Sequence, residues 1–255
     1  MVPLVPFWLL ALLRAAEPPP RTLDVLEVFS GQGNLWQACS SLGLSARGFD
    51  NRQAWEEDAT LFDGYMLLLL LVMSVKEGGL IWFAPPCSWW IFLSQPNHQR
   101  KAANQWAGKV DDLNVKKANH IAAATSAVVR LAMSRLVQVV IEQPTDSCLF
   151  NFPEMAKAAR ALPFRGIRTY LRSFDPSFPC PKPLQLWGSC HWLKHLRRNE
   201  PFDNKVAEGT YQVLADGHVK GGCGLAETAI YPRAFGEAVS ALASSSLKLP
   251  RHLRF

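Results

Sequence analysis

A short apolar segment that stops at two consecutive prolines indicates how this chain is organised. Residues 80–84 are apolar and lie between Gly79 and Pro85-Pro86. A segment of this length with such boundaries is typical of a fully buried strand, and proline cannot continue the hydrogen bonding of a central strand. We therefore expect a buried strand over residues 80–84, with Cys87 held on a rigid loop just beyond its end.

Apolar strand-like segments alternate with helical patterns along most of the chain. The expected strands are residues 23–29, 45–49, 80–84 and 136–141, and the expected helices are residues 35–42, 66–75, about 115–135 and 233–244. Such alternation produces a mostly parallel sheet with crossover helices on both faces. The sequence therefore predicts an α/β fold of the Rossmann-like kind.

The last third of the chain is less regular. Residues 164–174 have the composition of one or two strands, and residues 179–188 indicate an extended segment that enters an edge strand. We expect an apolar N-terminal extension with a proline-rich linker over residues 1–21, a single domain over residues 22–246 and a basic tail over residues 247–255. Within that domain, an irregular region that faces the substrate is expected over about residues 165–228.

The size and cysteine content limit the class of protein. A chain of 255 residues with 49% hydrophobic residues is long enough for one large domain. Its six cysteines include no CxxC pair, which is typical of reduced thiols and gives no sign of a zinc site or a disulfide-rich scaffold. No metal site is expected.

Two apolar segments are candidates for a membrane or targeting segment. Residues 1–16 and 66–75 are both shorter than the roughly 20 residues that a membrane helix needs. Residues 1–16 also lack the basic start of a signal peptide, although a targeting segment and a plain extension both remain open. We expect an intracellular, soluble monomer without a membrane partner.

The net charge permits a polyanionic partner without requiring one. The formal net charge is +6, but the 27 basic residues are scattered among 21 acidic ones. One basic cluster consists of His191, Lys194, His195, Arg197 and Arg198. Such a cluster can neutralise phosphates, and the alternative is surface charge without a partner.

A glycine loop follows the first expected strand and precedes the first expected helix. Gly31 and Gly33 allow the backbone to approach a ligand closely, and the helix that follows offers free N–H groups. Asp50, roughly 20 residues later, ends the next strand and could accept hydrogen bonds from both ribose hydroxyls. These features favour a cofactor that carries a nucleoside; the alternative is an ordinary tight turn.

Cys87 and Glu142 are the candidate reactive groups. Each directly follows an expected strand and lies beside a proline. Cys87 is positioned as a nucleophile, although cysteine is also a common small buried residue. A buried carboxyl such as Glu142 has a raised pKa that suits a general acid, and the alternative is a structural role in capping a helix or holding a loop.

Two further regions carry basic side chains. The polar segment 94–112 contains Arg100 and is expected to be a loop, either a mobile lid that contacts phosphate or an ordinary solvated loop. Lys182, in the extended segment, could face a phosphate or solvent, and we favour solvent.

Together these motifs resemble the cytosine-5 DNA methyltransferases and their compact relatives in phage and algal genomes. The resemblance extends over about residues 23–243 and rests on motifs that occur in the family's order. They are Phe29-Ser30-Gly31-Gln32-Gly33 for the cofactor, Asp50-Asn51 for the ribose, Pro86-Cys87 for the nucleophile and Glu142-Gln143-Pro144 for the ring contact, with Lys182-Pro183 and Tyr231-Pro232 as further counterparts.

The resemblance implies an S-adenosylmethionine-dependent methyltransferase fold and activity. In this family Cys87 would add to carbon 6 of cytosine while Glu142 holds the ring nitrogen at position 3. The implied cofactor residues are Phe29, Ser30, Gly31, Gly33, Asn34, Leu35, Asp50, Asn51, Asp58 and Pro85. The implied substrate residues are Pro86, Ser88, Arg100, Gln143, Pro144 and Lys182.

The chain departs from the family pattern in two places. Gln143-Pro144 replaces the commoner Asn-Val, and no QxRxR motif is present, so that Arg100 or Arg168 would have to substitute for its arginines. The expected partner is nucleic acid, with DNA as the leading substrate. Two alternatives stay open: the same fold acting on RNA or another acceptor, and a non-catalytic domain that binds nucleic acid or another partner.

Overall fold

The computed structural model describes residues 19–199, 211–215, 219–221 and 227–249. Residues 1–18, most of the expected irregular region beyond residue 199 and the basic tail from residue 250 lie outside the described residues. Cys223 also lies outside them.

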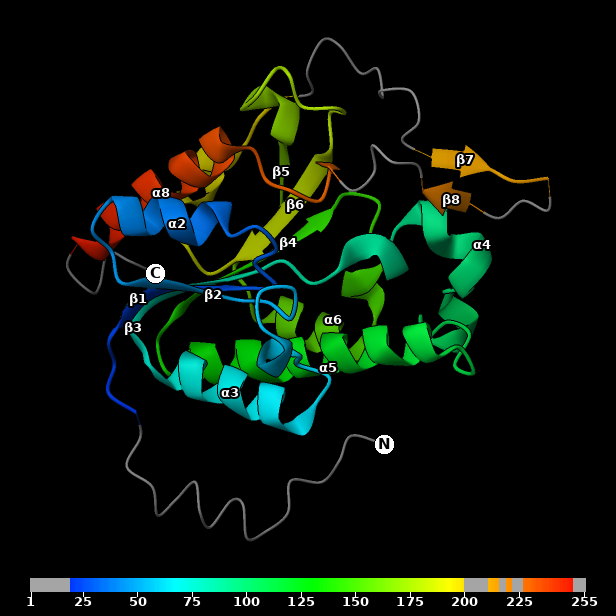
Figure 1. Ribbon diagram of the computed structural model, residues 1–255, viewed down its shortest axis with the longest axis horizontal. Coiled ribbons are helices and arrows are strands. Elements are labelled where there is room, and N and C mark those ends of the chain that lie inside the picture. Colours follow the sequence, from blue (N-terminus) through cyan, green and yellow to red (C-terminus); the bar gives the residue numbers. More distant parts are fainter. Residues whose placement is uncertain (1–18, 200–210, 216–218, 222–226, 250–255) are drawn as a thin grey trace, which may run out of the picture.

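The described chain is built around one six-stranded sheet (Figure 1). Its strands are β1 (Leu23–Val28), β2 (Ala46–Phe49), β3 (Val75–Phe83), β4 (Gln138–Pro144), β5 (Phe164–Tyr170) and β6 (Pro183–Gly188), in the order β2-β1-β3-β4-β6-β5. The four strands from β2 to β4 are parallel, and β6 is antiparallel to both of its neighbours. The predicted mostly parallel α/β sheet is confirmed, and its layout is compatible with a Rossmann-like arrangement. A separate antiparallel pair consists of β7 (Tyr211–Val213) and β8 (Val219–Gly221).

Helices cover both faces of the sheet. The α-helices are α2 (Asn34–Ser41), α3 (Phe62–Met73), α4 (Gln95–His98), α5 (Leu113–Ser134), α6 (Pro153–Arg160) and α8 (Arg233–Leu247). The short 3-10 helices are η1 (Trp55–Glu57), η2 (Cys87–Trp89), η3 (Phe92–Ser94), η4 (Ala102–Asn104), η5 (Leu149–Asn151), η6 (Leu171–Ser173) and η7 (His191–Leu196). Helices α2 and α8 lie on one face, and α3, α5 and α6 lie on the other (Figure 1).

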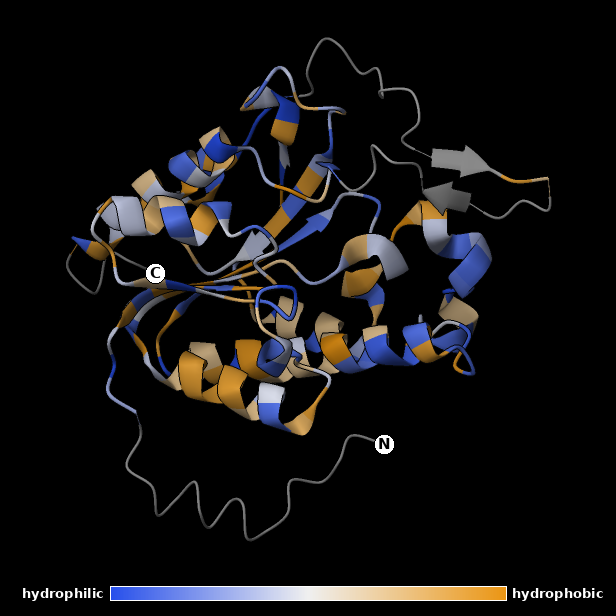
Figure 2. Ribbon diagram, viewed as in Figure 1, coloured by the Kyte–Doolittle hydropathy of each residue, from blue (hydrophilic) through white to orange (hydrophobic). Residues whose placement is uncertain are grey.

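The core is divided between the two faces because neighbouring residues of a strand point in opposite directions. Leu26, Val28 and Ile81 pack with the residues of α3, α5 and α6, whereas Leu80 and Trp82 pack with those of α2 and α8. Helix α3 is the most uniformly hydrophobic of these helices (Figure 2). Among the described helices, none combines the length and the apolar character needed to cross a bilayer.

The boundary between α3 and β3 differs from the prediction. The helix expected over residues 66–75 begins at Phe62 and ends at Met73, and β3 starts at Val75. Residues 77–79, which separate the expected helix from the strand expected over residues 80–84, therefore lie inside β3. Gly78 has a φ of 75° and its N–H donates to the Leu136 carbonyl, and the pairing of β1 with β3 is irregular over this stretch. The glycines thus form a strand irregularity rather than a helix end.

The boundaries of β4 and β6 also differ from the prediction. Glu142 and Pro144 lie within β4 instead of following it, because they pair with Leu186 and Leu184 of β6. The expectation that residues 179–188 enter an edge strand is wrong, since β6 lies between β4 and β5 and β5 is the edge.

The parallel strands end at the same level. Val28 pairs with Phe49 on one side and with Phe83 on the other, and Phe83 pairs with Ile141. Strand β2 lies on one side of β1, and β3 lies on the other. Open α/β sheets bind ligands at such a point, where the order of the strands reverses. The loops after β1, β2 and β3 and the end of β4 therefore share one rim.

Candidate functional site

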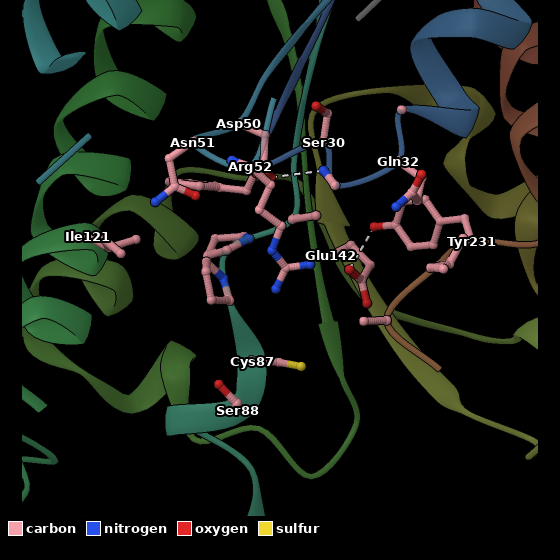
Figure 3. Close-up of a pocket in the computed structure, with 18 of the residues that line it drawn as sticks. Ser30, Gln32, Asp50, Asn51, Arg52, Cys87, Ser88, Ile121, Glu142 and Tyr231 are labelled. Carbon is pink, nitrogen blue, oxygen red and sulfur yellow. Dashed lines mark hydrogen bonds between the residues drawn. The ribbon is translucent and has the colours of Figure 1, made fainter. Parts of the chain in front are cut away.

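A cavity of about 620 Å³ lies at this rim (Figure 3). Its volume is within the range of small-molecule sites. The sequence-predicted residues that line it are Phe29, Ser30, Gly31, Gly33, Asn34, Asp50, Asn51, Asp58, Pro85, Pro86, Cys87, Ser88, Glu142 and Lys182. The loops that follow the ends of these strands therefore converge on one cavity.

The glycine loop is fixed against the end of β2. The Gly31 N–H donates to Oδ2 of Asp50 at 2.8 Å, and the Arg52 N–H donates to Oδ1 at 2.8 Å. Each carboxylate oxygen of Asp50 still has a lone pair that can accept a ligand hydroxyl. Asp50 thus holds the loop and remains able to bind a ribose.

The two glycines of the loop have different roles. Gly31 has a φ of 54°, and a Cβ there would meet no protein atom within 4 Å, so its backbone borders open space in which a ligand can approach. A Cβ on Gly33 would lie 2.1 Å from Nε1 of Trp36, which makes this glycine a requirement of packing. Phe29 also has a positive φ, 62°, which few non-glycine residues adopt.

Cys87 begins η2 and is half-buried in the cavity wall. Burial raises the pKa of its thiol above the ordinary value; the positive charge of Lys182 opposes this shift and the Glu142 carboxyl adds to it. The thiol is therefore mostly protonated at neutral pH, and its use as a nucleophile requires removal of that proton.

Gln143 is hydrogen-bonded to the loop that carries Cys87 and does not line the cavity. Its Nε2 donates to the Pro85 carbonyl at 2.6 Å, and its Oε1 accepts a hydrogen bond from the Ser147 hydroxyl at 2.8 Å. The predicted substrate contacts of Gln143 and Pro144 are therefore not present in the cavity lining, because both residues are engaged by neighbouring backbone and by β6.

Glu142 is buried, and only one of its carboxyl oxygens has a partner. Oε2 accepts a hydrogen bond from the Tyr231 hydroxyl at 2.7 Å, and Oε1 has no partner among the described residues. Burial raises the pKa of this carboxyl, while Lys182 and the Tyr231 hydrogen bond oppose the shift. The unpaired oxygen of this carboxyl can therefore take one further hydrogen bond, as a donor when Glu142 is protonated and as an acceptor when it is ionised.

Lys182 faces the cavity, so the preference for solvent is wrong. It lies just before β6 with a φ of 37°, and its Nζ donates to the Thr228 carbonyl. Its charge affects the pKa of both Cys87 and Glu142. The charge of Lys182 therefore acts on both candidate reactive groups.

Arg100 does not reach the cavity. Its guanidinium is buried, donates to the carbonyls of Trp89 and Trp106 and to Oδ1 of Asn119, and lies 3.5 Å from the ring centroid of Trp90. The segment expected to be a bare loop instead contains α4 and short 3-10 helices folded around this arginine. The predicted substrate contact is therefore replaced by a structural role.

Leu35 is also absent from the cavity lining. Its side chain is fully buried in the core between α2 and the sheet. The cofactor contact expected of it is not available to the side chain.

No family model and no curated protein matches this chain. The geometry and chemistry of the cavity therefore carry the functional argument.

Two cavity residues were not assigned a role from the sequence. Tyr231 precedes α8 and contacts Glu142; the sequence marked it as part of the Tyr231-Pro232 counterpart but gave it no role. Arg52 extends into the cavity between Asp50 and Glu142 in the view of Figure 3. Its place directly after Asp50-Asn51 was the only available signal.

The basic cluster lies away from the cavity, at η7. There Arg197 and Arg198 line a second hollow of about 300 Å³ together with Arg168 of the edge strand β5. The guanidinium of Arg198 lies 4.8 Å from the ring centroid of Phe174. Three arginines thus gather on one edge of the sheet.

The main cavity combines groups that suit addition of a sulfur nucleophile to a polarised ring. It contains a thiol, a carboxyl with a raised pKa, two cations and a glycine loop open to a ligand. No group of three metal-ligating side chains is found among the described residues.

Proposed function

We propose that this protein is an S-adenosylmethionine-dependent methyltransferase that acts on carbon 5 of cytosine in DNA. One observation carries the proposal: Cys87 and Glu142 line the same cavity as the glycine loop and Asp50. A methyl transfer of this kind needs a nucleophile, an acid and a cofactor loop within reach of one another.

The cavity wall fits an adenosyl cofactor on the side of β1 and β2. Gly31 leaves room for a ligand against the backbone, α2 begins directly after the loop, and Asp50 can accept ribose hydroxyl groups. Phe29 and Asn51 border the same part of the cavity. When bound there, S-adenosylmethionine supplies an electrophilic methyl group on its sulfonium sulfur.

Cys87 and Glu142 perform the steps that the protein contributes. The Cys87 thiol gives its proton to solvent, and its sulfur forms a bond to carbon 6 of the ring. The electron pair of the carbon 5–carbon 6 double bond moves to carbon 5 while Glu142 binds the ring nitrogen at position 3. After carbon 5 has accepted the methyl group, the proton on carbon 5 leaves to solvent, and the electrons of that bond restore the double bond between carbons 5 and 6. The bond between carbon 6 and sulfur breaks, and its electron pair returns to Cys87.

A base can reach Cys87 only after it leaves its stack. Unstacking costs a few kcal/mol, which contacts with the protein must offset. The cations Arg52 and Lys182 line the cavity and offer hydrogen-bond donors to a polar base or its phosphate.

RNA remains a second candidate substrate. Arg100 is buried outside the cavity and does not replace the arginines of the missing QxRxR motif. None of its described contacts distinguishes DNA from RNA. The fold and the cofactor do not fix the acceptor. The proposal is therefore tested on both nucleic acids.

The test compares the intact protein with Cys87→Ser in an assay of methyl transfer from tritiated S-adenosylmethionine. Duplex DNA, single-stranded DNA and RNA are offered separately. We expect label in DNA with the intact protein and a loss of at least about 1,000-fold with Cys87→Ser, because the hydroxyl is a far weaker nucleophile. Cys180→Ser, which changes a cysteine outside the cavity, is the matched control and is expected to retain activity.

A trapping experiment identifies the nucleophile directly. DNA containing 5-fluorocytosine has no proton to lose at carbon 5, so the Cys87 adduct should persist and migrate as a covalent complex. Label transfer that survives Cys87→Ser would exclude the thiol mechanism. Transfer to RNA alone would reassign the substrate, and absence of cofactor binding by calorimetry would favour the non-catalytic alternative.

A further inference from the structure

A buried series of hydrogen bonds ends on Oε2 of Glu142. Nε1 of Trp82 donates to the Tyr231 hydroxyl at 3.2 Å, and that hydroxyl donates to Oε2 of Glu142 at 2.7 Å. All three side chains are buried. These hydrogen bonds join the end of β3 to the segment before α8 and to Glu142 of β4.

The direction of these hydrogen bonds is fixed by Trp82. An indole N–H can only donate, so the Tyr231 oxygen must accept from it. The single proton of the Tyr231 hydroxyl is then directed to Oε2 of Glu142. Burial and the nearby carboxyl of Glu142 raise the pKa of Tyr231 well above its ordinary value, so this proton is present at every working pH.

The position of Tyr231 is also fixed from its backbone and ring. Nδ2 of Asn34, the first residue of α2, donates to the Tyr231 carbonyl at 2.6 Å. The ring of Tyr231 packs against Phe235, with centroids 5.1 Å apart. The hydroxyl is therefore aimed by contacts that do not involve Glu142.

The remaining oxygen, Oε1, has the capacity for a further hydrogen bond. It is buried and without a partner among the described residues, and Glu142 lines the cavity. In the view of Figure 3, Tyr231 and Cys87 lie on opposite sides of the Glu142 carboxyl. Because Oε2 already accepts the Tyr231 proton, a proton carried by Glu142 belongs on Oε1.

We propose that Tyr231, oriented by Trp82, is a positioning residue that places the proton of Glu142 on Oε1, where the carboxyl can donate it to an acceptor nitrogen of the substrate ring. This inference deepens the proposed function and rests on it. The groups that face this carboxyl are Lys182 before β6, Cys87 after β3 and Tyr231 before α8. Of these, only Tyr231 makes a hydrogen bond to it among the described contacts.

The test is Tyr231→Phe, which removes only the hydroxyl and keeps the ring contact with Phe235. We expect kcat for methyl transfer to fall about 10- to 100-fold, as for loss of a hydrogen bond to a group that can be charged, with little change in KM for the cofactor. The limb of the pH profile controlled by Glu142 should move to higher pH, because the hydroxyl stabilises the ionised carboxyl. Tyr65→Phe, a half-buried tyrosine on α3 that lines neither hollow, is the matched control and should change neither quantity.

Two further variants separate positioning from a structural effect. In a Glu142→Gln background, Tyr231→Phe should shift no pH limb, since the amide does not titrate. Trp82→Phe keeps an aromatic ring and removes the indole donor, and it should lower kcat by a smaller factor than Tyr231→Phe. A fall in kcat without any movement of the pH limb would overturn the inference, and so would unchanged kinetics in Tyr231→Phe.

A measurement that needs no activity keeps this inference separate from the proposed function. Carbon-13 NMR of protein labelled at the glutamate carboxyl carbons follows the titration of Glu142, which is assigned by its absence in Glu142→Gln. An upward shift of that titration in Tyr231→Phe supports the hydrogen-bond role even if the intact protein transfers no methyl group. Identical titrations in both proteins would refute it even if the protein is an active methyltransferase.

Discussion

Among single residues, Glu27 is a buried carboxyl whose contribution to the free energy of unfolding can be measured through its pH dependence. Its Oε2 accepts the Trp36 N–H at 2.9 Å, and its Oε1 has no partner among the described residues. Burial, opposed by that hydrogen bond and reinforced by the charge of Asp50, raises its pKa from 4.5 to about 8. The folded protein therefore binds this proton more tightly than the unfolded chain does, and stability falls as pH rises from about 4.5 through about 8.

We expect Glu27→Gln to remove this loss of stability. At pH 7 the variant should unfold with a free energy about 3 kcal/mol higher than that of the intact protein, and at pH 4.5 the two should be nearly equal. Urea denaturation at several pH values measures the difference. Glu56→Gln, at an exposed position, is the control. A variant that is no more stable at pH 8 than the intact protein would contradict this prediction.

The site residues that could be predicted from the sequence are those set by the chain next to them. Gly31, Asp50, Cys87 and Glu142 were found because each lies at or just beyond the end of a buried strand, and parallel strands end at one rim. Tyr231 lies 89 residues from Glu142, and nothing local links the two. Its role depends on packing of α8 against the sheet, which the sequence pattern does not specify.

Arg100 and Lys182 show that the sequence does not determine whether a long basic side chain points into the cavity. Both are basic residues in polar or extended segments, and the sequence predicted a substrate contact for Arg100 and favoured solvent for Lys182. The structure buries Arg100 over Trp90 and turns Lys182 into the cavity. The direction of a long side chain is decided by tertiary partners rather than by its neighbours in sequence.

Among the helices, α5 has a side-chain cap at its N-terminus. Asp112 precedes Leu113–Ser134, and its Oδ1 accepts the N–H of Asn114 at 2.7 Å and, at longer range, that of Val115 at 3.4 Å. We expect Asp112→Ala to lower the free energy of unfolding by about 1 kcal/mol, the usual loss of an N-cap. Denaturation at pH 7 measures it, with the adjacent exposed Asp111→Ala as the control. Equal effects of the two substitutions would show that the cap contributes nothing specific.

Most helices and strands were predicted, whereas several of their ends were not. The expected helix over about residues 115–135 is found as Leu113–Ser134, because its pattern is long and its cap is local. Strand β4 extends to Pro144 only because β6 pairs with it, and Gly78 lies in a strand because the chain bulges against β1. These boundaries follow from pairing between distant segments, which no local pattern records.

Across the whole molecule, three arginines gather at one edge of the sheet. Arg168, Arg197 and Arg198 line one hollow at β5, and none of them has an ion-pair partner among the described residues. The Tyr170 end of β5 pairs with Pro183, next to Lys182 of the main cavity. A nucleic acid with a base in the cavity would therefore extend its phosphates toward this edge.

The double substitution of Arg168 and Arg197 by alanine tests this geometry through the salt dependence of DNA binding. Each phosphate contact contributes about −0.9 to the slope of log K against log salt concentration on duplex DNA. We expect the slope to become shallower by up to about 2 units, measured by fluorescence anisotropy with a labelled duplex at several salt concentrations. Cys87→Ser should bind with an unchanged slope, because the thiol makes no phosphate contact.

Arg130→Ala is the matched control for that experiment, because Arg130 is an exposed arginine on α5, on the other face of the sheet from α2 and α8. Its loss changes the net charge by one unit without touching the β5 edge. If Arg130→Ala alters the slope as much as an arginine of the hollow does, binding reflects the overall charge of +6. A slope that changes only with Arg168 and Arg197 instead locates the phosphates at the β5 edge and gives the substrate a defined direction from the cavity.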